Sequence, residues 1–575
     1  MKELLKFFKG YRLQSVLAPL FKMAEATLEL LVPLIVKDMI DAGIANGDPR
    51  LLAARAGLLV LMALVGLGFS LTAQFFSAKT AVGVSTALRG ELFRRVTALS
   101  YPDIDRLGTS NLITRLTSDV NQIQNGVNLT LRLLLRSPFV VLGAVVMAFQ
   151  VDAYTARVFA GAVPVLSVVI AAVMFGTMPL YKQVQKRLDA VTKAVRENLN
   201  GVRVLRAFAK EDEEIRGFGE KNGAFTAAAF RAGRVSALMN PLTYVLINLA
   251  VVLLIRLGAL RVNEGLLTQG AVVAQYNYMS QILVELVKLA SLIVTVSRAL
   301  ASAGRVQEVL RVTPSIACPE TGAEPDFSAP AVEFRNVSLR YGENSEDSLS
   351  EISFSAQPGE KIGLIGATGS GKTSVINLIP RFYDATAGEV YVFGHDVRSY
   401  SAETLSSLVA VVPQKAVLFA GTIRENLLWG DPSADDAALA DAVRRSQSEN
   451  IIENKEGGLD AAVEQNGRNL SGGQRQRLTI ARALVRQAPI LILDDAAAAL
   501  DAATEKALRT ALSTLDPLPC VFVVSQRSTA VADCDKILVT ADGRLTGCGT
   551  HAELLEQNET YRYIYDCELR GMAHA

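Results

Sequence analysis

The chain has 575 residues, of which 50% are hydrophobic, and its mean hydropathy is +0.28. It is too apolar for an ordinary soluble protein and long enough for several domains. A formal net charge of +1 leaves no basic excess to neutralise phosphates, so nucleic acid is excluded as the main partner. No pair among the five cysteines has CxxC spacing, which indicates neither a disulfide framework nor a zinc site.

The first residues, 1–14, mix basic side chains with leucines and phenylalanines. No short apolar core with a small-residue cleavage site follows, so a secretory signal peptide is not indicated. We expect an amphipathic helix on the cytosolic membrane surface, where membrane lipid is its partner.

Apolar segments of membrane-spanning length fill much of the next part of the chain. Because roughly twenty residues are needed to cross the hydrocarbon core, these segments predict about six crossings. Buried helices of a large soluble protein are the weaker alternative. The crossings are expected at residues 16–39, 51–76, 129–149, 158–180, 244–260 and 271–296.

Two long inserts, residues 77–128 and 181–243, are charged and helical in pattern. Basic residues beside their membrane ends predict that both inserts face the cytoplasm, together with both termini. If helix continues into each insert, about 25 residues add roughly 35–40 Å of stalk. Residues 101–108 and 206–212 are expected to be the breaks at the stalk tips, and plain polar loops are the alternative.

The composition changes sharply after residue 310. Residues 311–330 contain four prolines and no apolar periodicity, which predicts a linker between a membrane domain, 1–310, and a second domain, 331–575. In the second domain strand-like runs alternate with helical ones, as in an α/β nucleotide-binding domain.

A glycine-rich motif lies between an apolar run, 362–365, and a helical stretch. It matches GxxxxGK[ST], a loop whose backbone cradles phosphates, with Lys372 for the β- and γ-phosphates and Thr373 for Mg²⁺. The motif consists of Gly366, Ala367, Thr368, Gly369, Ser370, Gly371, Lys372 and Thr373, and Ser374 follows.

A second glycine motif comprises Leu470, Ser471, Gly472, Gly473 and Gln474. It precedes a helix expected at 475–485, where backbone N–H groups and the helix N-terminus favour an anion. By itself such a motif is often an ordinary capped turn, but both motifs in this order predict ATP binding. The apolar run 490–493 that follows is typical of a buried strand and ends in two aspartates, Asp494 and Asp495.

With these motifs, the chain resembles an ABC exporter half-transporter along its whole length. The resemblance implies a membrane all-α six-helix transmembrane domain with cytoplasmic helical extensions, fused to an α/β P-loop ABC nucleotide-binding domain. It also implies ATP-driven transport, with ATP and Mg²⁺ as cofactors. The inner membrane is the expected location, with the ATP-binding domain in the cytoplasm.

The resemblance also implies roles for single residues. Tyr341 would stack on adenine, residues 366–374 would hold the phosphates, and Thr373, Gln414 and Asp494 would form the Mg²⁺ site. Residues 470–474 would be the signature motif and Asp501 the D-loop aspartate. Residues 101–108 and 206–212 would be coupling helices. Because each ATP lies between one chain's phosphate loop and the other chain's signature, the partner is a second half-transporter.

Two positions depart from the family pattern, and both belong to the catalytic set with Gln414. By the resemblance, residues 490–494 are the Walker B strand. The residue after its aspartate, Asp494, is normally a glutamate that polarises water, but here it is Asp495. Its carboxylate falls about an ångström short, a misplacement that can cost roughly a hundredfold in rate. The family also has a switch histidine after the next strand. Here that position is Gln526, whose side chain cannot carry a proton.

These two changes beside an intact signature favour the degenerate-site subunit of a bacterial heterodimeric multidrug exporter. A homodimer with slow ATPase is the alternative on assembly. An ATP-gated channel or a sensor on the same fold is the alternative on function.

Substrate contacts are harder to predict. Polar residues at membrane depth usually face a cavity or one another. Tyr276, Tyr278 and Met279 would suit a small amphipathic molecule, and a lipid, a peptide or a metal chelate stays open as an alternative. The polar residues at this depth are Lys22, Glu25, Glu29, Gln74, Arg132, Arg136, Gln275, Asn277, Glu285 and Lys288.

Overall fold

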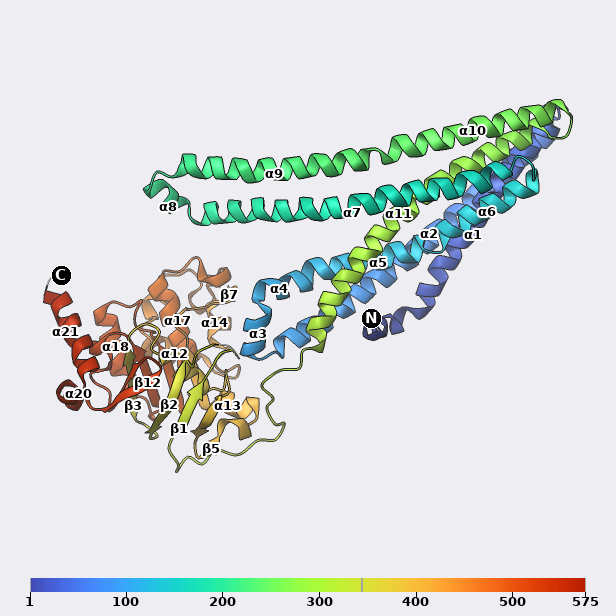
Figure 1. The fold of residues 1–575 in the computed structure, drawn as a ribbon. Coiled ribbons are helices and arrows are strands. Elements are labelled where there is room, and N and C mark those ends of the chain that lie inside the picture. Colours follow the sequence, from blue (N-terminus) through green and yellow to red (C-terminus); the bar gives the residue numbers. More distant parts are fainter. Residues whose placement is uncertain (1, 343–344, 574–575) are drawn as a thin grey trace. The chain divides into compact units, whose positions relative to one another are not determined.

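The computed structural model describes residues 2–342 and 345–573, and the chain forms two compact units (Figure 1). The first unit comprises residues 1–98 and 108–312, and the second comprises residues 99–107 and 313–575. The short helix α3 (Tyr101–Leu107) therefore belongs to the second unit, although its neighbours in sequence belong to the first.

The first unit is entirely helical in its described residues. A 3-10 helix (Lys2–Tyr11) precedes α1, in the stretch where an amphipathic helix is predicted. Its α-helices are α1 (Arg12–Asp38), α2 (Pro49–Thr97), α4 (Thr109–Thr114), α5 (Val120–Leu133), α6 (Arg136–Val151), α7 (Arg157–Asn200), α8 (Val202–Ala207), α9 (Glu211–Ala237), α10 (Met239–Asn263) and α11 (Gln269–Arg311).

Five helical stretches in the described residues are long and apolar enough to cross a membrane. They are Pro49–Thr97, Thr109–Val151, Arg157–Asn200, Glu211–Asn263 and Gln269–Arg311, and they coincide with five of the expected crossings. Helix α1 is not among them, and it carries three charged residues, Lys22, Glu25 and Glu29, in its middle. The crossing expected at 16–39 therefore stays a prediction.

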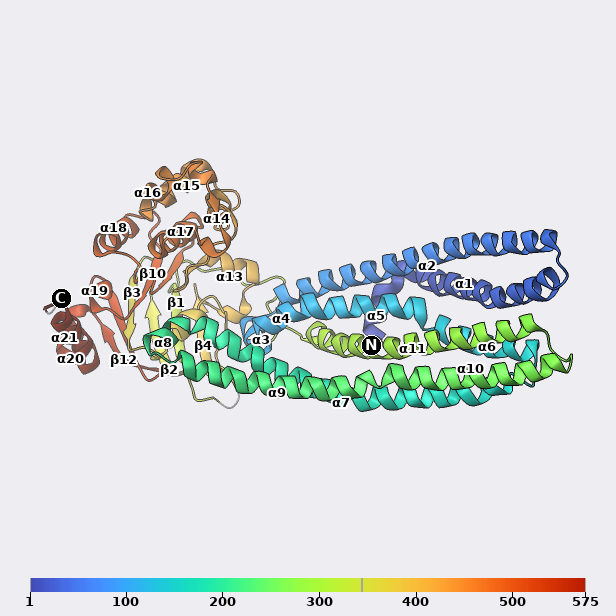
Figure 2. The ribbon, with the colours of Figure 1, turned by 90° about the horizontal axis from the view of Figure 1, so that it is seen from above.

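The predicted helical extensions are confirmed. Helix α2 continues without a break from its apolar part to Thr97, and α7 continues to Asn200. Helices α7 and α9 run side by side and are joined by α8 (Figure 2). The expected breaks fall at α3 and at the end of α8.

Close helix packing gives the first unit its core. The largest fully buried side chains there include Phe159, Tyr278 and Ile282, from α7 and α11. The Tyr278 hydroxyl donates to the Leu30 carbonyl at 2.8 Å, which ties α11 to α1. Gly143 of α6 admits Leu30, because a Cβ there would lie 2.5 Å from Leu30 Cδ1.

The second unit is built on a six-stranded sheet in the order β12-β11-β3-β10-β9-β6. All neighbouring strands are parallel except β11 and β12. Near-continuous runs of Ile, Leu and Val suit these strands, because both faces of a parallel sheet are buried. The strands are β3 (Lys361–Gly366), β6 (Val409–Val412), β9 (Ile490–Asp494), β10 (Cys520–Ser525), β11 (Lys536–Ala541) and β12 (Arg544–Gly549).

An antiparallel sheet in the order β2-β1-β4-β5 shares its core with β3, β9 and β10. Its strands are β1 (Val332–Leu339), β2 (Leu349–Ala356), β4 (Ala387–Val392) and β5 (His395–Asp396), and β7 (Gly421–Thr422) pairs with β8 (Ala462–Val463). The helices after α3 are α12 (Lys372–Leu378), α13 (Ala402–Leu408), α14 (Ile423–Leu427), α15 (Asp436–Arg445), α16 (Glu449–Glu453), α17 (Gly472–Val485), α18 (Ala502–Leu512), α19 (Ser528–Val531), α20 (His551–Gln557) and α21 (Glu559–Ala573).

The alternation of strands and helices predicted after residue 331 is confirmed. Residues 312–331 contain no helix or strand, and β1 begins at Val332. One predicted boundary was wrong: the helix expected at 475–485 begins at Gly472. The reason is a capping box in which Ser471 and Gln474 satisfy each other's backbone N–H groups, so both glycines lie in the first helical turn.

Candidate nucleotide-binding site

A cleft of about 480 Å³ lies at the carboxyl ends of β3, β9 and β10. Ligands of open α/β sheets bind at this edge, and the volume lies in the range of small-molecule sites. The lining residues come from well-separated parts of the second unit. They are Glu346, Asp347, Ser348, Thr368, Gly369, Gly371, Lys372, Thr373, Ser374, Gln414, Asp494, Asp495, Val524, Ser525, Gln526, Asp542 and Gly543.

The glycine-rich loop turns sharply between β3 and α12. Gly369 and Gly371 have φ values of +82° and +96°, a region that side chains disfavour. A Cβ on Gly371 would lie 2.9 Å from the Ser348 carbonyl oxygen, so the loop is braced against its neighbours. The Ser370 hydroxyl lies 2.9 Å from that of Thr540 inside the domain. The loop is therefore held in shape at the N-terminus of α12.

Lys372 opens α12, and its side chain is buried. The Nζ donates to the Gly366 and Ala367 carbonyl oxygens, each at 2.8 Å. Burial lowers the pKa of Lys372, while Asp495 and Asp494 oppose that shift. A phosphate chain along this loop would meet the ammonium and a helix N-terminus together, so these residues fit ATP.

Thr373 and Asp494 supply the oxygen ligands that Mg²⁺ prefers. The Thr373 hydroxyl lies 3.5 Å from each carboxylate oxygen of Asp494, which is itself 7% exposed. Burial raises the pKa of Asp494, and the neighbouring Asp495 raises it further. A divalent cation would relieve this repulsion, so the residues present fit the metal.

The two altered positions face the same cleft. The Asp495 backbone has a φ of +47°, and its N–H donates to the Val524 carbonyl at 3.0 Å. Its carboxylate accepts from Gln414 Nε2 at 3.3 Å. Gln526 reaches the phosphate loop, where its Oε1 accepts from the Thr368 hydroxyl at 3.2 Å. The structure thus brings Gln414, Asp494, Asp495 and Gln526 together in one cleft.

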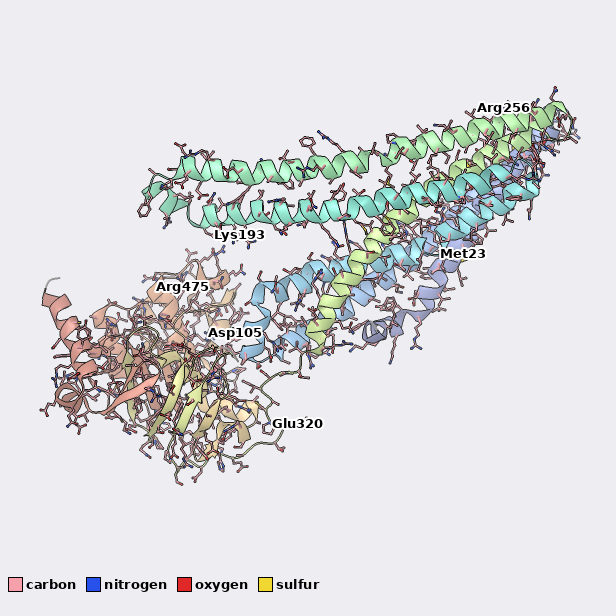
Figure 3. The ribbon with its side chains drawn as sticks, viewed as in Figure 1. Met23, Asp105, Lys193, Arg256, Glu320 and Arg475 are labelled. Carbon is pink, nitrogen blue, oxygen red and sulfur yellow. The ribbon has the colours of Figure 1, made fainter. Side chains whose placement is uncertain are left out.

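Tyr341 lies beside the cleft without lining it. Its hydroxyl donates to Ser374 Oγ at 2.9 Å, and its ring meets Tyr383 edge to face at 4.9 Å. The Tyr383 hydroxyl donates to Asp105 of α3 at 2.6 Å (Asp105 is marked in Figure 3). The segment expected as a coupling helix therefore contacts the residues next to Tyr341.

The second glycine motif and Asp501 do not line the cleft. Ser471 and Gln474 form the capping box of α17, and Leu470 is buried beneath it. Asp501 caps α18, where its carboxylate accepts from the Thr504 N–H at 3.0 Å. A single chain thus leaves its signature residues away from its own phosphate loop.

Sequence reasoning missed several cleft residues, among them Ser348, Asp542 and Gly543. Gly543 packs against the Ser348 carbonyl, where a Cβ would lie 2.8 Å from the oxygen. The Asp-Gly pair between two strand-like runs is a hairpin signal. That signal predicts the turn between β11 and β12 but gives no indication that it touches the phosphate loop.

The polar residues of the membrane segments pair largely with one another. Arg136 lies between Glu29 and Glu285, with distances of 2.5 Å and 2.6 Å to their carboxylate oxygens. Glu285 also accepts from Ser137 and Lys288, each at 2.8 Å. Lys22 pairs with Glu25 at 2.5 Å. These charged residues thus have partners within the first unit.

The chain matches two family models, the ABC transporter transmembrane region over residues 15–286 and the ABC transporter model over residues 349–498. It is 34% identical over 569 residues to the ABC transporter ATP-binding protein YfiB of Bacillus subtilis (strain 168), with 99% of this chain and 98% of YfiB covered. It is 29% identical over 587 residues to YgaD of the same organism, a putative multidrug export ATP-binding/permease protein, with 98% of each chain covered.

A solved structure of a bacterial Atm1-family ABC exporter with ATP bound has the same fold. It matches with a TM-score of 0.80 at 22% identity, covering 98% of each chain. Fold, cleft and relatives together define a membrane transporter powered by ATP. The chain belongs to the ABC transporters, as an exporter half-transporter whose multi-pass helical domain is fused to an ATP-binding domain. Its activity is ATP hydrolysis coupled to transport.

Proposed function

We propose that the chain is one subunit of a heterodimeric exporter in the inner membrane, with the ATP-binding domain and both termini in the cytoplasm. Its own cleft binds Mg-ATP but hydrolyses it slowly, and its signature motif completes the partner's competent site. The observation that carries the proposal is the pair Asp495 and Gln526, both of which line the cleft.

Phosphoryl transfer depends on positioning and on stabilisation of charge. Lys372 and the loop amides orient the phosphates, and Gln414 holds the Asp495 carboxylate at 3.3 Å. Mg²⁺, held by Thr373 and Asp494, would offset negative charge on the phosphates. The carboxylate of Asp495 stops one methylene short of the position from which a glutamate would polarise water. Gln526 can donate a hydrogen bond to a γ-phosphate but cannot supply a proton.

The exposed signature supports a dimer. Ser471 and Gly472 lie at the N-terminus of α17 and are exposed, with Arg475 in the same first turns (Figure 3). A helix N-terminus that offers amides to solvent is suited to phosphate from another chain. In the head-to-tail arrangement of ABC dimers, that phosphate belongs to ATP in the partner's cleft.

Exposed apolar residues also support partner contacts. Phe208, just after α8, is 72% exposed. It lies far in sequence from the expected membrane crossings, so contact with lipid does not explain its exposure. In the second unit Phe419 and Trp429 stack at 4.2 Å and are 45% and 61% exposed. We assign Phe208 to a groove of the partner's ATP-binding domain, and the Phe419–Trp429 pair to the partner's equivalent helix. Closure of the dimer on ATP would then move the membrane helices.

The transported molecule is proposed to be small and amphipathic, drug-like or lipid. Exposed Tyr276 of α11 offers an aromatic surface, and the buried Glu285 further along the same helix is already paired. YgaD, a putative multidrug exporter by name, supports this substrate class.

The direct test measures Mg-ATP binding and steady-state phosphate release by the purified chain alone. Binding with slow release supports the proposal. Fast Mg²⁺-dependent release that is abolished by Asp495→Asn would contradict it and favour a homodimer.

The cytoplasmic placement has a separate test. Single cysteines at the exposed positions 109 and 213, in a cysteine-free chain, should resist an impermeant thiol reagent added to intact cells, because the basic inserts oppose translocation. Labelling from outside would overturn the topology.

Directional ATP-driven uptake into inside-out vesicles by the assembled dimer would separate a pump from an ATP-gated channel.

A further inference from the structure

The C-terminal helix α21 reaches back to the segment that carries Gln526. We call residues 526–529 the switch segment. It begins directly after β10 ends at Ser525, and it leads into the short helix α19. At its start Gln526 accepts from Thr368 of the phosphate loop at 3.2 Å. At its end, Ser528 and Thr529 meet a carboxylate from α21, Glu568.

Glu568 accepts every donor that these two residues offer. The Ser528 N–H donates to Glu568 Oε2 at 2.7 Å, and the Thr529 N–H donates to the same oxygen at 3.3 Å. Both hydroxyls also donate to the Glu568 carboxylate. The first N–H groups of a helix have no partner within the helix, so Glu568 serves as the cap of α19 from a distant part of the chain.

Helix α21 is itself fixed in place. Tyr561 is fully buried in a cluster with Ile365 of β3 and Val531 of α19. Its hydroxyl lies 2.6 Å from His551 Nδ1, and its N–H donates to Asn558 at 2.8 Å. Because α21 is anchored in this way, its carboxylate can fix the position of the switch segment.

Neighbouring contacts leave the switch segment little freedom elsewhere. Arg527 pairs with Glu505 at 2.6 Å, and Glu505 is 5% exposed.

Burial raises the pKa of Glu568, but the hydrogen bonds from Ser528 and Thr529 outweigh it and leave the pKa below its ordinary value. Glu568 is therefore ionised at neutral pH, as a cap for four donors requires.

We propose that Glu568 is a positioning residue for the switch segment, and that α21 thereby sets how tightly the cleft holds ATP. Loss of the carboxylate frees the donors of Ser528 and Thr529, and the single turn of α19 then frays. Gln526 lies two residues before Ser528 and loses its fixed approach to Thr368. The phosphate loop is then less well organised for ATP.

The test uses the full-length chain and calorimetric titration with ATP in the presence of Mg²⁺. Glu568→Gln preserves size but replaces an acceptor with a donor, and we expect it to weaken ATP binding by about fivefold or more, the lower end of typical site-to-site coupling. Hydrogen exchange at Ser528 and Thr529 should speed up in the same variant. Asp566→Asn is the matched control, since it removes the same charge from an exposed position on α21 and should bind ATP like the parent.

Two further variants keep the outcomes distinct. Ser528→Ala removes one donor from the cap and should weaken binding in the same direction, which guards against failure of a Glu568 variant to fold. Glu568→Gln with a lowered melting temperature but unchanged ATP affinity would overturn the proposal, because that is the result of a purely structural cap. Equal weakening by Asp566→Asn would overturn it as well.

The inference rests on the proposed placement of Gln526 at the phosphates, and Lys372→Ala separates the two. If Lys372→Ala binds ATP like the parent, the nucleotide site itself is wrongly assigned. If Lys372→Ala loses binding while Glu568→Gln keeps it, only the role of Glu568 fails.

Discussion

Charged residues meet in two regions of this chain, and the two regions treat charge in opposite ways. In the first unit, the Glu285 carboxylate accepts hydrogen bonds from Arg136, Ser137 and Lys288 at 2.6–2.8 Å, so its charge is balanced. In the cleft, Asp494 and Asp495 are neighbours, and Lys372 directs its hydrogen bonds to the Gly366 and Ala367 carbonyls. Charge that is balanced by the chain stabilises the fold, and charge left unbalanced in a cleft is available to a ligand.

The two regions also differ in the distances between their polar groups. Thr373 lies 3.5 Å from both oxygens of Asp494, a loose contact that leaves room for a metal ion. The Arg136 contacts of 2.5 Å and 2.6 Å leave no such room. Substitutions in the cleft should therefore alter binding with modest effects on stability. Substitutions around Arg136 should do the reverse.

The largest effect is expected for Lys372→Ala. Its ammonium is the only cation among the residues that line the cleft in the described structure. Loss of a group that stabilises charge on the phosphates typically costs about a hundred- to a thousandfold in rate. Titration with Mg-ATP and phosphate release by the purified chain alone check this, because the partner's site would dominate the ATPase of the assembled dimer. Exposed Lys506→Ala is the control. Retained binding in Lys372→Ala would show that the cleft is not the nucleotide site.

Arg136→Met should destabilise the membrane unit without weakening ATP binding. The change leaves Glu285 and Glu29 without their shared cation, and breaking a buried pair costs about 3–5 kcal/mol. Because Lys288 still pairs with Glu285, the lower end of that range is expected. Thermal unfolding of the full chain measures the loss, which a second change, Glu285→Gln, should partly reverse. The exposed Arg55–Asp38 pair is the control, and Arg55→Met should cost about 1 kcal/mol or less. A loss as small for Arg136 would contradict the balanced-charge account.

Asp494→Asn should raise the melting temperature of the nucleotide-free chain slightly at neutral pH. Burial and Asp495 raise the pKa of Asp494, so the folded state favours its protonated form. Stability is therefore lost as pH rises from the ordinary pKa of an aspartate through the raised value. The difference between variant and parent should shrink as pH falls toward that ordinary value. The same variant should lose the Mg²⁺-dependent stabilisation by ATP. A variant less stable than the parent at neutral pH would contradict this reading of the cleft.

Local patterns predicted the fold and much of the cleft. The spacing of Gly366 to Thr373 after an apolar run indicates the phosphate loop, because strand, turn and helix are contiguous there. Asp494 and Asp495 end a strand whose apolar run is visible in the sequence. The glycines at 472 and 473 were assigned to a turn, although Ser471 and Gln474 carry the capping-box spacing that starts the helix at Gly472.

Contacts between distant residues could not be predicted in this way. Ser348 and Gly543 brace the phosphate loop through backbone atoms, which no side-chain pattern records. The partners of Arg136 come from α1 and α11, and periodicity within one helix does not indicate which helices adjoin it. Glu568 acts on Ser528 across forty residues of sequence, and its own surroundings read as an ordinary C-terminal helix.

We propose that this chain lends its signature to a partner while its own cleft hydrolyses ATP slowly. The most direct measurement compares Ser471→Ala or Gly472→Glu with Asp495→Asn in the complex of this chain with its partner half-transporter. The signature changes act at the competent site and should lower ATPase and transport about a hundredfold or more. Asp495→Asn alters a carboxylate that is already too short and should leave substantial activity. Equal damage from the two kinds of change would contradict the account, because Asp495 would then serve a site that hydrolyses ATP.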